Sequence, residues 1–321
     1  MAPRMCANLK WIVAIAFLLT FTYPLVTYIQ AETVFKEEAM KAKVSHKGIF
    51  DETLHKGALQ IRYFDLEANT KSGDAILIES PDGKRMLIDA GIVDTGERLD
   101  HYLDQLNVNH LDIAVATHPH HDHIGGYHTL LKSKQIDLFI RPNLEHHTET
   151  YQVFLNFLRE QTTPEQLVAA GDRFTLGEHV EVEILSPSEE ELPHANESGK
   201  LSTAKMNDQS LVLKVTYLDH TFLFTGDIYK KKERELIKLY GDKLDVDVLH
   251  APHHGDSTSS SQAFIDKVKP QHTIISANIL QSKKVYNRYV KSGSNVHATS
   301  KNGTILFVSD GENLTVLSEV E

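Results

Sequence analysis

The feature that most constrains this chain is the segment 111–126, where an apolar run leads directly into a dense cluster of histidines. Residues 111–116, LDIAVA, are nearly all apolar and predict a strand buried on both faces. The next ten residues read THPHHDHIGG, with four histidines and one aspartate in six consecutive positions. A packed core cannot hold such a cluster without partners, because unpaired buried polar groups cost free energy. The segment therefore predicts a binding site at the end of a buried strand.

The spacing H-x-H-x-D-H in this cluster fits a site for two metal ions. His118 and His120 alternate along an extended loop and so point the same way, toward one ion, whereas Asp122 and His123 follow the turn and face a second. Imidazole nitrogen and carboxylate oxygen suit zinc, and also manganese or iron(II). The alternative is a polar surface loop that binds metal only adventitiously.

Two ions need more ligands than one loop supplies, and two downstream segments offer them. Asp227 follows the expected strand 221–224 and is placed to lie between the ions, although a Gly-Asp pair after a strand is more often only a turn. The last ligand is expected from His253 or His254, which follow the apolar run 246–249. We favour His253 as the ligand and His254 as a group that supports the site or contacts the substrate, with the reverse left open.

The N-terminal region has the layout of a secretory signal over residues 1–31. Arg4 and Lys10 precede an apolar run from Trp11 to Leu19, and small or polar residues lead to Ala31. We expect cleavage and secretion; the alternative is an uncleaved anchor that keeps the protein at the membrane. The single cysteine of the chain lies in this segment, so the mature protein would contain no disulfide.

The charge of the mature chain excludes a general attraction to nucleic acid or to anionic membranes. The leader holds two of the 33 basic residues and none of the 44 acidic ones, so 31 basic residues would remain against 44 acidic ones, a net charge of −13. A polyanionic substrate would then need a local basic patch.

The rest of the chain alternates between strand and helix patterns. Residues 32–58 form an N-terminal lead-in, and residues 59–321 form one domain. Strands are expected at 61–64, 75–78, 85–88, 111–116, 180–185, 210–217 and 221–224. Helices are expected at 97–106, 151–158 and 232–240. A further helix is expected from Tyr127, where Gly125 and Gly126 let the backbone turn tightly. Two β-rich halves with interspersed helices predict a four-layer α/β arrangement, two packed sheets with helices outside.

The motifs together resemble the metallo-β-lactamase superfamily, and within it the hydrolase domain of the ComEC-type competence proteins. The likeness spans residues 59–318 and rests on LIDAG at 87–91, HPHHDHIGG at 118–126, FTGD at 224–227 and PHHGDSTSS at 252–260, with GDAILI, NDQSLVL and TSKNGTI in the matching order. It implies a single-domain αββα sandwich, a binuclear hydrolase, and metal ligands at His118, His120, Asp122, His123, Asp227, His253 and His254. None of the membrane-channel helices of those proteins is expected, so transport is not implied.

Three positions depart from the patterns of these relatives. Asn207 and Asp208 stand where the superfamily often has an isolated third-motif histidine, so one ion is expected to be less fully ligated. His120 stands where many channel-type relatives have aspartate. Asp256 replaces the hydroxyl of a His-His-Gly-Ser sequence, which is expected to weaken phosphate binding.

The expected chemistry is hydrolysis of a phosphodiester, as a nuclease or as an esterase of cell-wall or small-molecule phosphodiesters. Two divalent cations, most simply zinc, lower the pKa of a bridging water and offset phosphate charge. Asp122 or Asp227 would orient that water, and His254 would protonate the leaving oxygen. The lysines at 205 and 230–232 would either contact phosphate or simply form the solvated start of a helix. The alternatives are hydrolysis of a β-lactam or another carbonyl substrate, and a non-catalytic extracellular zinc-binding protein. The remaining histidines are expected to be surface or structural, with His194 and His250 the least certain and His121 supporting its neighbours.

Overall fold

The computed structural model describes residues 48–68, 73–193 and 201–320. The predicted signal at 1–31 and most of the lead-in lie outside these residues, as does His194. Gly48–Glu321 form one compact unit. None of the helices in the described ranges has both the length and the apolar composition needed to cross a bilayer.

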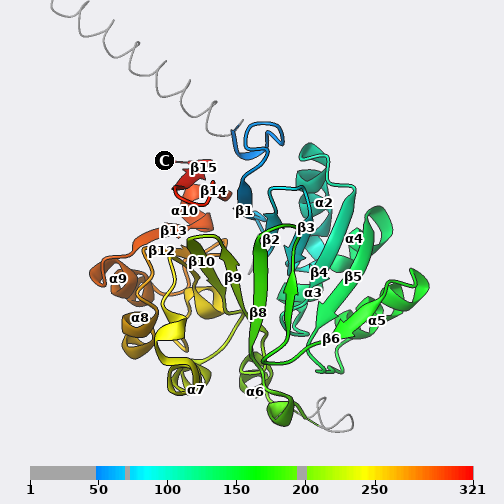
Figure 1. Ribbon diagram of the computed structural model, residues 1–321. Coiled ribbons are helices and arrows are strands. Elements are labelled where there is room, and N and C mark those ends of the chain that lie inside the picture. Colours follow the sequence, from blue (N-terminus) through cyan, green and yellow to red (C-terminus); the bar gives the residue numbers. More distant parts are fainter. Residues whose placement is uncertain (1–47, 69–72, 194–200, 321) are drawn as a thin grey trace, which may run out of the picture. The chain divides into compact units, whose positions relative to one another are not determined.

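Two mixed sheets make up the centre of the described chain (Figure 1). Sheet A has the order β15-β14-β1-β2-β3-β4-β5-β6 and sheet B the order β13-β12-β11-β10-β9-β8-β7. The strands of sheet A are β1 Leu59–Tyr63, β2 Ile76–Glu79, β3 Arg85–Ile88, β4 His110–Val115, β5 Gln135–Arg141, β6 Glu165–Leu167, β14 Ile305–Ser309 and β15 Leu314–Ser318. Those of sheet B are β7 Arg173–Thr175, β8 Val180–Ser186, β9 Val212–Tyr217, β10 His220–Phe224, β11 Val248–His250, β12 His272–Ile275 and β13 Asn295–Ala298.

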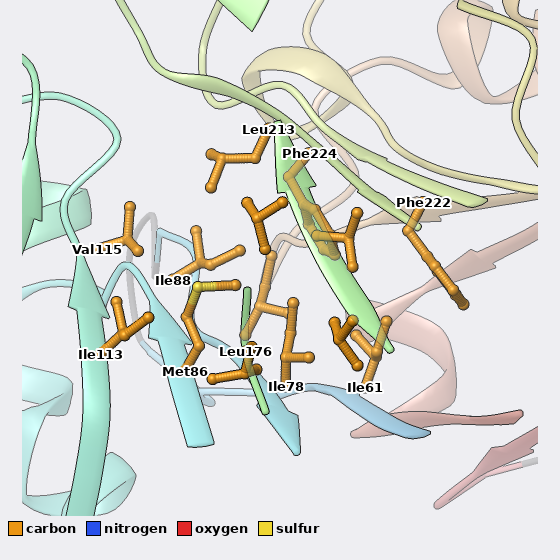
Figure 2. Close-up of a cluster of buried hydrophobic side chains, with 14 of the residues drawn as sticks. Ile61, Ile78, Met86, Ile88, Ile113, Val115, Leu176, Leu213, Phe222 and Phe224 are labelled. Carbon is orange, nitrogen blue, oxygen red and sulfur yellow. The ribbon is translucent and has the colours of Figure 1, made fainter. Parts of the chain in front are cut away.

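The facing surfaces of the two sheets form an apolar core (Figure 2). Its alternation follows the pleat of the strands: in β8, Val180, Val182 and Ile184 are buried, whereas Glu181 is exposed. Burial of each large apolar side chain contributes about 1.5–3 kcal/mol. The labelled side chains come from sheet A (Ile61, Ile78, Met86, Ile88, Ile113 and Val115), from sheet B (Leu213, Phe222 and Phe224), and from the turn after β7 (Leu176).

Helices cover the outer face of each sheet and complete four layers (Figure 1). An apolar cluster joins sheet A to its helices, and another joins sheet B to its own. The helices against sheet A are α2 Gly96–Gln105, α3 His121–Ile124, α4 Tyr127–Ser133 and α5 Glu149–Glu160, and those against sheet B are α7 Lys230–Tyr240, α8 Gln262–Val268 and α9 Lys283–Lys291. Two short helices, α6 Thr203–Asn207 and α10 Thr299–Asn302, lie in connections. The predicted αββα sandwich is confirmed.

Residues 48–58, which the sequence assigned to the lead-in, include side chains that pack on the domain. Ile49 is fully buried, and its carbonyl oxygen accepts a hydrogen bond from Arg62 Nε at 2.8 Å. The ring of Phe50 stacks on that of Tyr102, with centroids 5.1 Å apart.

The strand directions bring the predicted site residues to one edge. Strands β3, β4 and β5 run parallel in sheet A, and β10, β11, β12 and β13 run parallel in sheet B. In open α/β sheets, functional groups gather where the carboxyl ends of parallel strands meet. The loops after β3, β4, β10, β11 and β12 therefore carry the candidate site.

Candidate metal centre

The loop after β4 and the loop after β10 form what we call the first ligand set: His118 Nε2, His120 Nδ1 and Asp227 Oδ2. The two imidazole nitrogens lie 3.0 Å apart, and His118 Nε2 lies 3.9 Å from Asp227 Oδ2. All three ligand atoms lie within 4.8 Å of one another. His118 and Asp227 are buried, while His120 is half-buried, so this set reaches the protein surface through His120.

The second ligand set contains Asp122, His123, His254 and the other oxygen of Asp227. His123 Nε2 lies 3.3 Å and His254 Nε2 lies 3.5 Å from Asp227 Oδ1, and His254 Nε2 lies 3.7 Å from Asp122 Oδ2. All four residues are buried. The carboxylate of Asp227 thus presents one oxygen to each set, the position that a residue between two metal ions requires.

The loop after β11 places two consecutive histidines on this centre by an unusual backbone. His253 and His254 have φ values of 51° and 53°, in the left-handed region that side chains other than glycine seldom adopt. The amide of His253 donates to the carbonyl oxygen of Gly226 at 3.0 Å, which ties the loop to the Asp227 turn. His253 Nε2 lies 3.7 Å from Asp227 Oδ2, so both rings approach Asp227, each from the side of a different oxygen. Such strained residues persist where the surrounding structure fixes them, often at functional sites.

The chemistry of the second ligand set fits a divalent cation. His123 Nε2, His254 Nε2 and Asp227 Oδ1 are buried and have no hydrogen-bond partner. Leaving a buried polar atom unpaired costs about 1–3 kcal/mol, whereas a bound cation would satisfy all three at once. Tetrahedral zinc with ligands at 2.0–2.1 Å places its ligand atoms about 3.3 Å apart, close to the separations found here.

Asp89, at the end of β3, supports a histidine of each set, a role that the sequence did not assign. Asp89 Oδ2 lies 2.7 Å from His123 Nδ1 and accepts a hydrogen bond from Thr117 Oγ1 at 2.7 Å. The Thr117 hydroxyl donates its only hydrogen to Asp89. It must therefore accept the hydrogen bond from His118 Nδ1, which lies 3.1 Å away. Both imidazoles then carry hydrogen on Nδ1 and turn an Nε2 lone pair toward the ligand sets. The sequence did contain a signal for this role, because Asp89 belongs to the LIDAG motif, which was used only as part of the family likeness.

Asp74, just before β2, supports the last histidine in the same way. His254 Nδ1 lies 3.0 Å from the carbonyl oxygen of Ser276, which can only accept, so this nitrogen carries the hydrogen. Asp74 Oδ1 lies 3.2 Å from His254 Nδ1 and 3.3 Å from His250 Nε2. Because His254 uses Nδ1 for these contacts, its Nε2 keeps the lone pair that a metal needs. This geometry favours His254 as a ligand over the proton-donor role expected for it.

Gly73 is required by the close approach of β2 to the metal-binding loop. It has φ +74°, and a Cβ built on it would lie 1.6 Å from the backbone oxygen of Asp122. Gly125 and Gly126 form the expected turn before α4, which begins at Tyr127 as predicted, but their φ values of −61° and −65° are ones that any residue adopts. A Cβ on Gly126 would lie 2.0 Å from the carbonyl oxygen of Ala90. Glycine is needed here for the close contact and not for the turn, because both residues let the loop pack against the segment after β3.

The electrostatics of the centre favour positive charge. Burial alone would lower the pKa of His123 and His254, but the carboxylates around them, Asp227 above all for His123 and Asp74 for His254, raise both pKa values well above the usual range. Burial alone would raise the pKa of Asp122 and Asp227, but the neighbouring imidazoles hold both well below the ordinary range. In the first set, burial and His123 lower the pKa of His120 to about 4. The acidic groups thus stay ionised and attract a cation.

Several residues that the sequence singled out lie away from the ligand sets. Lys232 is buried and pairs with Glu191 and Glu235, so it is neither a solvated residue nor a phosphate contact. Asp208 Oδ1 accepts a hydrogen bond from the amide of Tyr229 at 2.9 Å. His121 differs from these, because its Nδ1 lies 3.7 Å from Asp122 Oδ1 although its side chain is 65% exposed.

The comparisons agree with this centre. A family model described as the metallo-beta-lactamase superfamily matches residues 68–277, which include both ligand sets. The chain is 27% identical over 257 residues to ComE operon protein 3 of Bacillus subtilis (strain 168), covering 73% of this chain and 31% of that protein. It is 28% identical over 258 residues to the uncharacterized protein YcaI of Escherichia coli (strain K12), and the match covers 76% of this chain and 30% of that protein.

A third relative is the competence protein ComA of Neisseria gonorrhoeae, 26% identical over 241 residues, with 73% of this chain and 30% of that protein covered. The chain thus spans about a third of the length of these relatives. The competence proteins among them confirm the resemblance to the ComEC type. Because the family model covers more than half of the chain, the chain belongs to the metallo-beta-lactamase superfamily of metal-dependent hydrolases.

Proposed function

We propose that this protein is a binuclear metal-dependent phosphodiesterase. The observation that carries the proposal is the placement of Asp227, whose two carboxylate oxygens face two separate ligand sets. Sites of this kind suit displacement at phosphorus, in which an attacking and a leaving oxygen both need charge stabilisation. Zinc is the first choice of metal, and manganese and iron(II) are the alternatives.

The residues of the chain divide the work of the proposed reaction. Two divalent ions bound there would supply a hydroxide near neutral pH and offset the charge of the phosphate. Asp227 sets the separation of the two sets, and Asp122 helps to hold and orient the attacking water. Asp74 and Asp89 keep imidazole lone pairs aimed at the centre. Burial of the second set limits the access of bulk water, so substrate would enter by the half-buried His120.

Hydrolysis of bis-p-nitrophenyl phosphate tests this function. We expect the purified protein to turn over this ester, to lose activity in a chelator, and to regain it with zinc or manganese. Asp122→Ala should lower kcat by at least about 100-fold, more than its loss of metal accounts for. A protein that binds metal without turning over any phosphodiester would be a binding protein, and the proposal would then be wrong.

A substrate panel separates the members of this class. One relative is named a competence protein, and single-stranded DNA, which the family likeness suggests, is therefore one arm of the panel. The acidic charge of the chain favours a small or cell-wall phosphodiester instead. DNA binding that weakens steeply with salt would support the DNA arm. A β-lactam such as nitrocefin is the third arm, and turnover of it alone would favour carbonyl chemistry.

We propose as well that the protein is exported, on the layout of residues 1–31 alone. Expression with a C-terminal tag should yield extracellular protein whose N-terminus is Glu32. Membrane-bound protein that still begins at Met1 would instead indicate an uncleaved anchor.

A further inference from the structure

The two ligand sets differ in the number of protein residues they contain, and the smaller first set has room for one more ligand, His253. The second set as defined above contains Asp122, His123, His254 and Asp227. The first set contains only His118, His120 and Asp227. Structural and catalytic zinc sites in proteins usually use three or four protein ligands. A fourth protein group for the first set would have to approach Asp227 Oδ2, the oxygen that faces His118.

His253 is the residue that approaches this oxygen. Its Nε2 lies 3.7 Å from Asp227 Oδ2, comparable to the 3.9 Å between that oxygen and His118 Nε2. The imidazole packs against the ring of Tyr229, with centroids 5.0 Å apart, and its side chain is only 12% exposed. His253 meets the first set at Asp227 and lies outside the tighter group formed with His118 and His120.

The hydrogen-bond pattern decides which nitrogen of His253 carries hydrogen. Thr258 Oγ1 donates to Asp256 Oδ1 at 2.8 Å, because an ionised carboxylate only accepts. The same hydroxyl lies 2.7 Å from His253 Nδ1, so it accepts from that nitrogen. His253 Nε2 then carries no hydrogen, and it lies 3.7 Å from Asp227 Oδ2.

This pattern repeats the one that orients His118. In both places a carboxylate takes the hydrogen of a threonine hydroxyl, and that hydroxyl accepts from the Nδ1 of a histidine: Asp89, Thr117 and His118 in one, Asp256, Thr258 and His253 in the other. A lone pair in this position, 3.7 Å from Asp227 Oδ2, can be donated to a metal ion that this carboxylate oxygen also binds. Asp256, which on the sequence alone was expected to weaken phosphate binding, thereby acquires a positioning role.

We propose that His253 is a ligand of the metal ion held by the first ligand set, and that Asp256 and Thr258 are its positioning residues. The two consecutive histidines therefore serve different ions, His254 the second set and His253 the first. This assignment rests on the proposed binuclear function. It replaces the expectation that one of the pair binds metal while the other only supports it.

Zinc binding to chelator-stripped protein tests the assignment without reference to activity. Competition with a chromophoric chelator gives an affinity for each equivalent, and elemental analysis gives the stoichiometry. We expect two equivalents for the wild-type chain. His253→Ala should weaken one equivalent by at least about 10-fold and leave the other within about 2-fold, and Thr258→Val should weaken the same equivalent by about 10–100-fold. Ser257→Ala is the matched control in the same loop and should bind as the wild type does.

Double variants identify which ion is affected. His118→Ala removes a ligand of the first set, so the pair His118→Ala and His253→Ala should keep the same single tight equivalent as His118→Ala alone. Combining His253→Ala with His254→Ala should weaken both equivalents. Circular dichroism of each variant checks folding, and Thr258→Val provides a second route if His253→Ala does not fold.

Three outcomes would overturn the proposal or its foundation, and they are distinguishable. Wild-type protein that binds no zinc would refute the binuclear function itself. Unchanged zinc affinities in His253→Ala, with a fall in kcat only, would show that the ring acts on substrate and not on metal. Weakening of the equivalent that His254→Ala also weakens would place His253 at the second ion.

Discussion

At the scale of single residues, the centre depends on backbone conformations that most side chains avoid. Asp89, His253 and His254 all have positive φ values, 58°, 51° and 53°. Each such conformation costs of order 1–3 kcal/mol and is retained because it aims a polar group that the site uses. Gly73 completes this arrangement, because only a residue without a side chain fits against Asp122.

Substitution of Gly73 by alanine should disrupt both stability and metal binding. Its Cβ would meet the backbone oxygen of Asp122 at 1.6 Å, so the loop has to move. The matched control is Gly83→Ala, which has a similar φ of +83° but no atom within 4 Å of its Cβ. Urea unfolding should show a loss of about 1 kcal/mol for Gly83→Ala and clearly more for Gly73→Ala. Equal losses would mean that the contact with Asp122 is unimportant.

Substitution of Asp89 by asparagine should weaken zinc at both ligand sets. Asp89 supports His123 directly and His118 through Thr117, both from Oδ2, so replacing the carboxylate by a neutral amide, a weaker acceptor, weakens both supports. Loss of such an outer carboxylate typically weakens metal binding by 10–100-fold. Asp242→Asn, at an exposed carboxylate paired with Lys267, is the control and should bind zinc as the wild type does. Weakening confined to one equivalent would contradict the double role of Asp89.

At the scale of elements, the parallel strands carry their functional groups at one end and structural pairs along their length. The neighbouring strands β12 and β13 pair His272 with His297, whose rings stack with centroids 5.5 Å apart. His272 Nδ1 lies 3.2 Å from His297 Nε2, and the ring of Phe307 packs against both. The sequence left each histidine as either surface or structural, and the contacts between them fit the structural role.

This pair should make the fold sensitive to mild acid. Burial, then the neighbouring His272, lower the pKa of His297 to about 4, whereas an unfolded histidine has a pKa of about 6.5. Between pH 4 and pH 6.5 the unfolded chain binds a proton at His297 that the folded chain does not bind. The stability that neutral, buried His297 contributes is therefore present above pH 6.5 and is lost as pH falls toward 4. Metal-free wild-type protein should lose free energy of unfolding between pH 7 and pH 5. In His297→Gln this loss should be smaller by on the order of 1 kcal/mol, a figure that allows for solvent screening. Parallel pH profiles for the two proteins would refute this.

At the scale of the whole domain, the ligand sets join the two sheets. Asp74, Asp89 and the 118–123 loop belong to sheet A, whereas Asp227 and the 253–254 pair belong to sheet B. Metal binding would therefore cross-link the two layers at the edge of the apolar core that Figure 2 shows.

Zinc should consequently stabilise the entire domain. A ligand that binds only the folded state at 100 times its Kd adds about 2.7 kcal/mol per site. We expect the Tm of chelator-treated protein to rise when zinc is restored, and to rise little in Asp227→Ala, which removes an oxygen from each set. Thermal unfolding followed by circular dichroism measures both, and an equal rise in the variant would contradict the cross-link.

Much of the fold followed from local patterns. The predicted strands at 85–88, 180–185 and 221–224 match β3, β8 and β10, because apolar or alternating runs bounded by turn residues are properties of short segments. The strands β5, β12 and β13 and the helices α8 and α9 were not predicted. Some of these carried a local signal that was missed, since apolar positions alternate at Ile136 and Leu138 in β5 and lie four apart at Val285 and Tyr289 in α9.

By itself the sequence determined the types of ligand and the strand ends that carry them, because residue chemistry and periodicity are local. Only the tertiary structure decided how His253 and His254 face Asp227 from different sides, since that depends on two left-handed residues and on a carbonyl oxygen of Gly226. It also decided the support of His254 by Asp74, 180 positions earlier in the chain. No local pattern encodes a contact of that separation, because it forms only when the two sheets pack face to face.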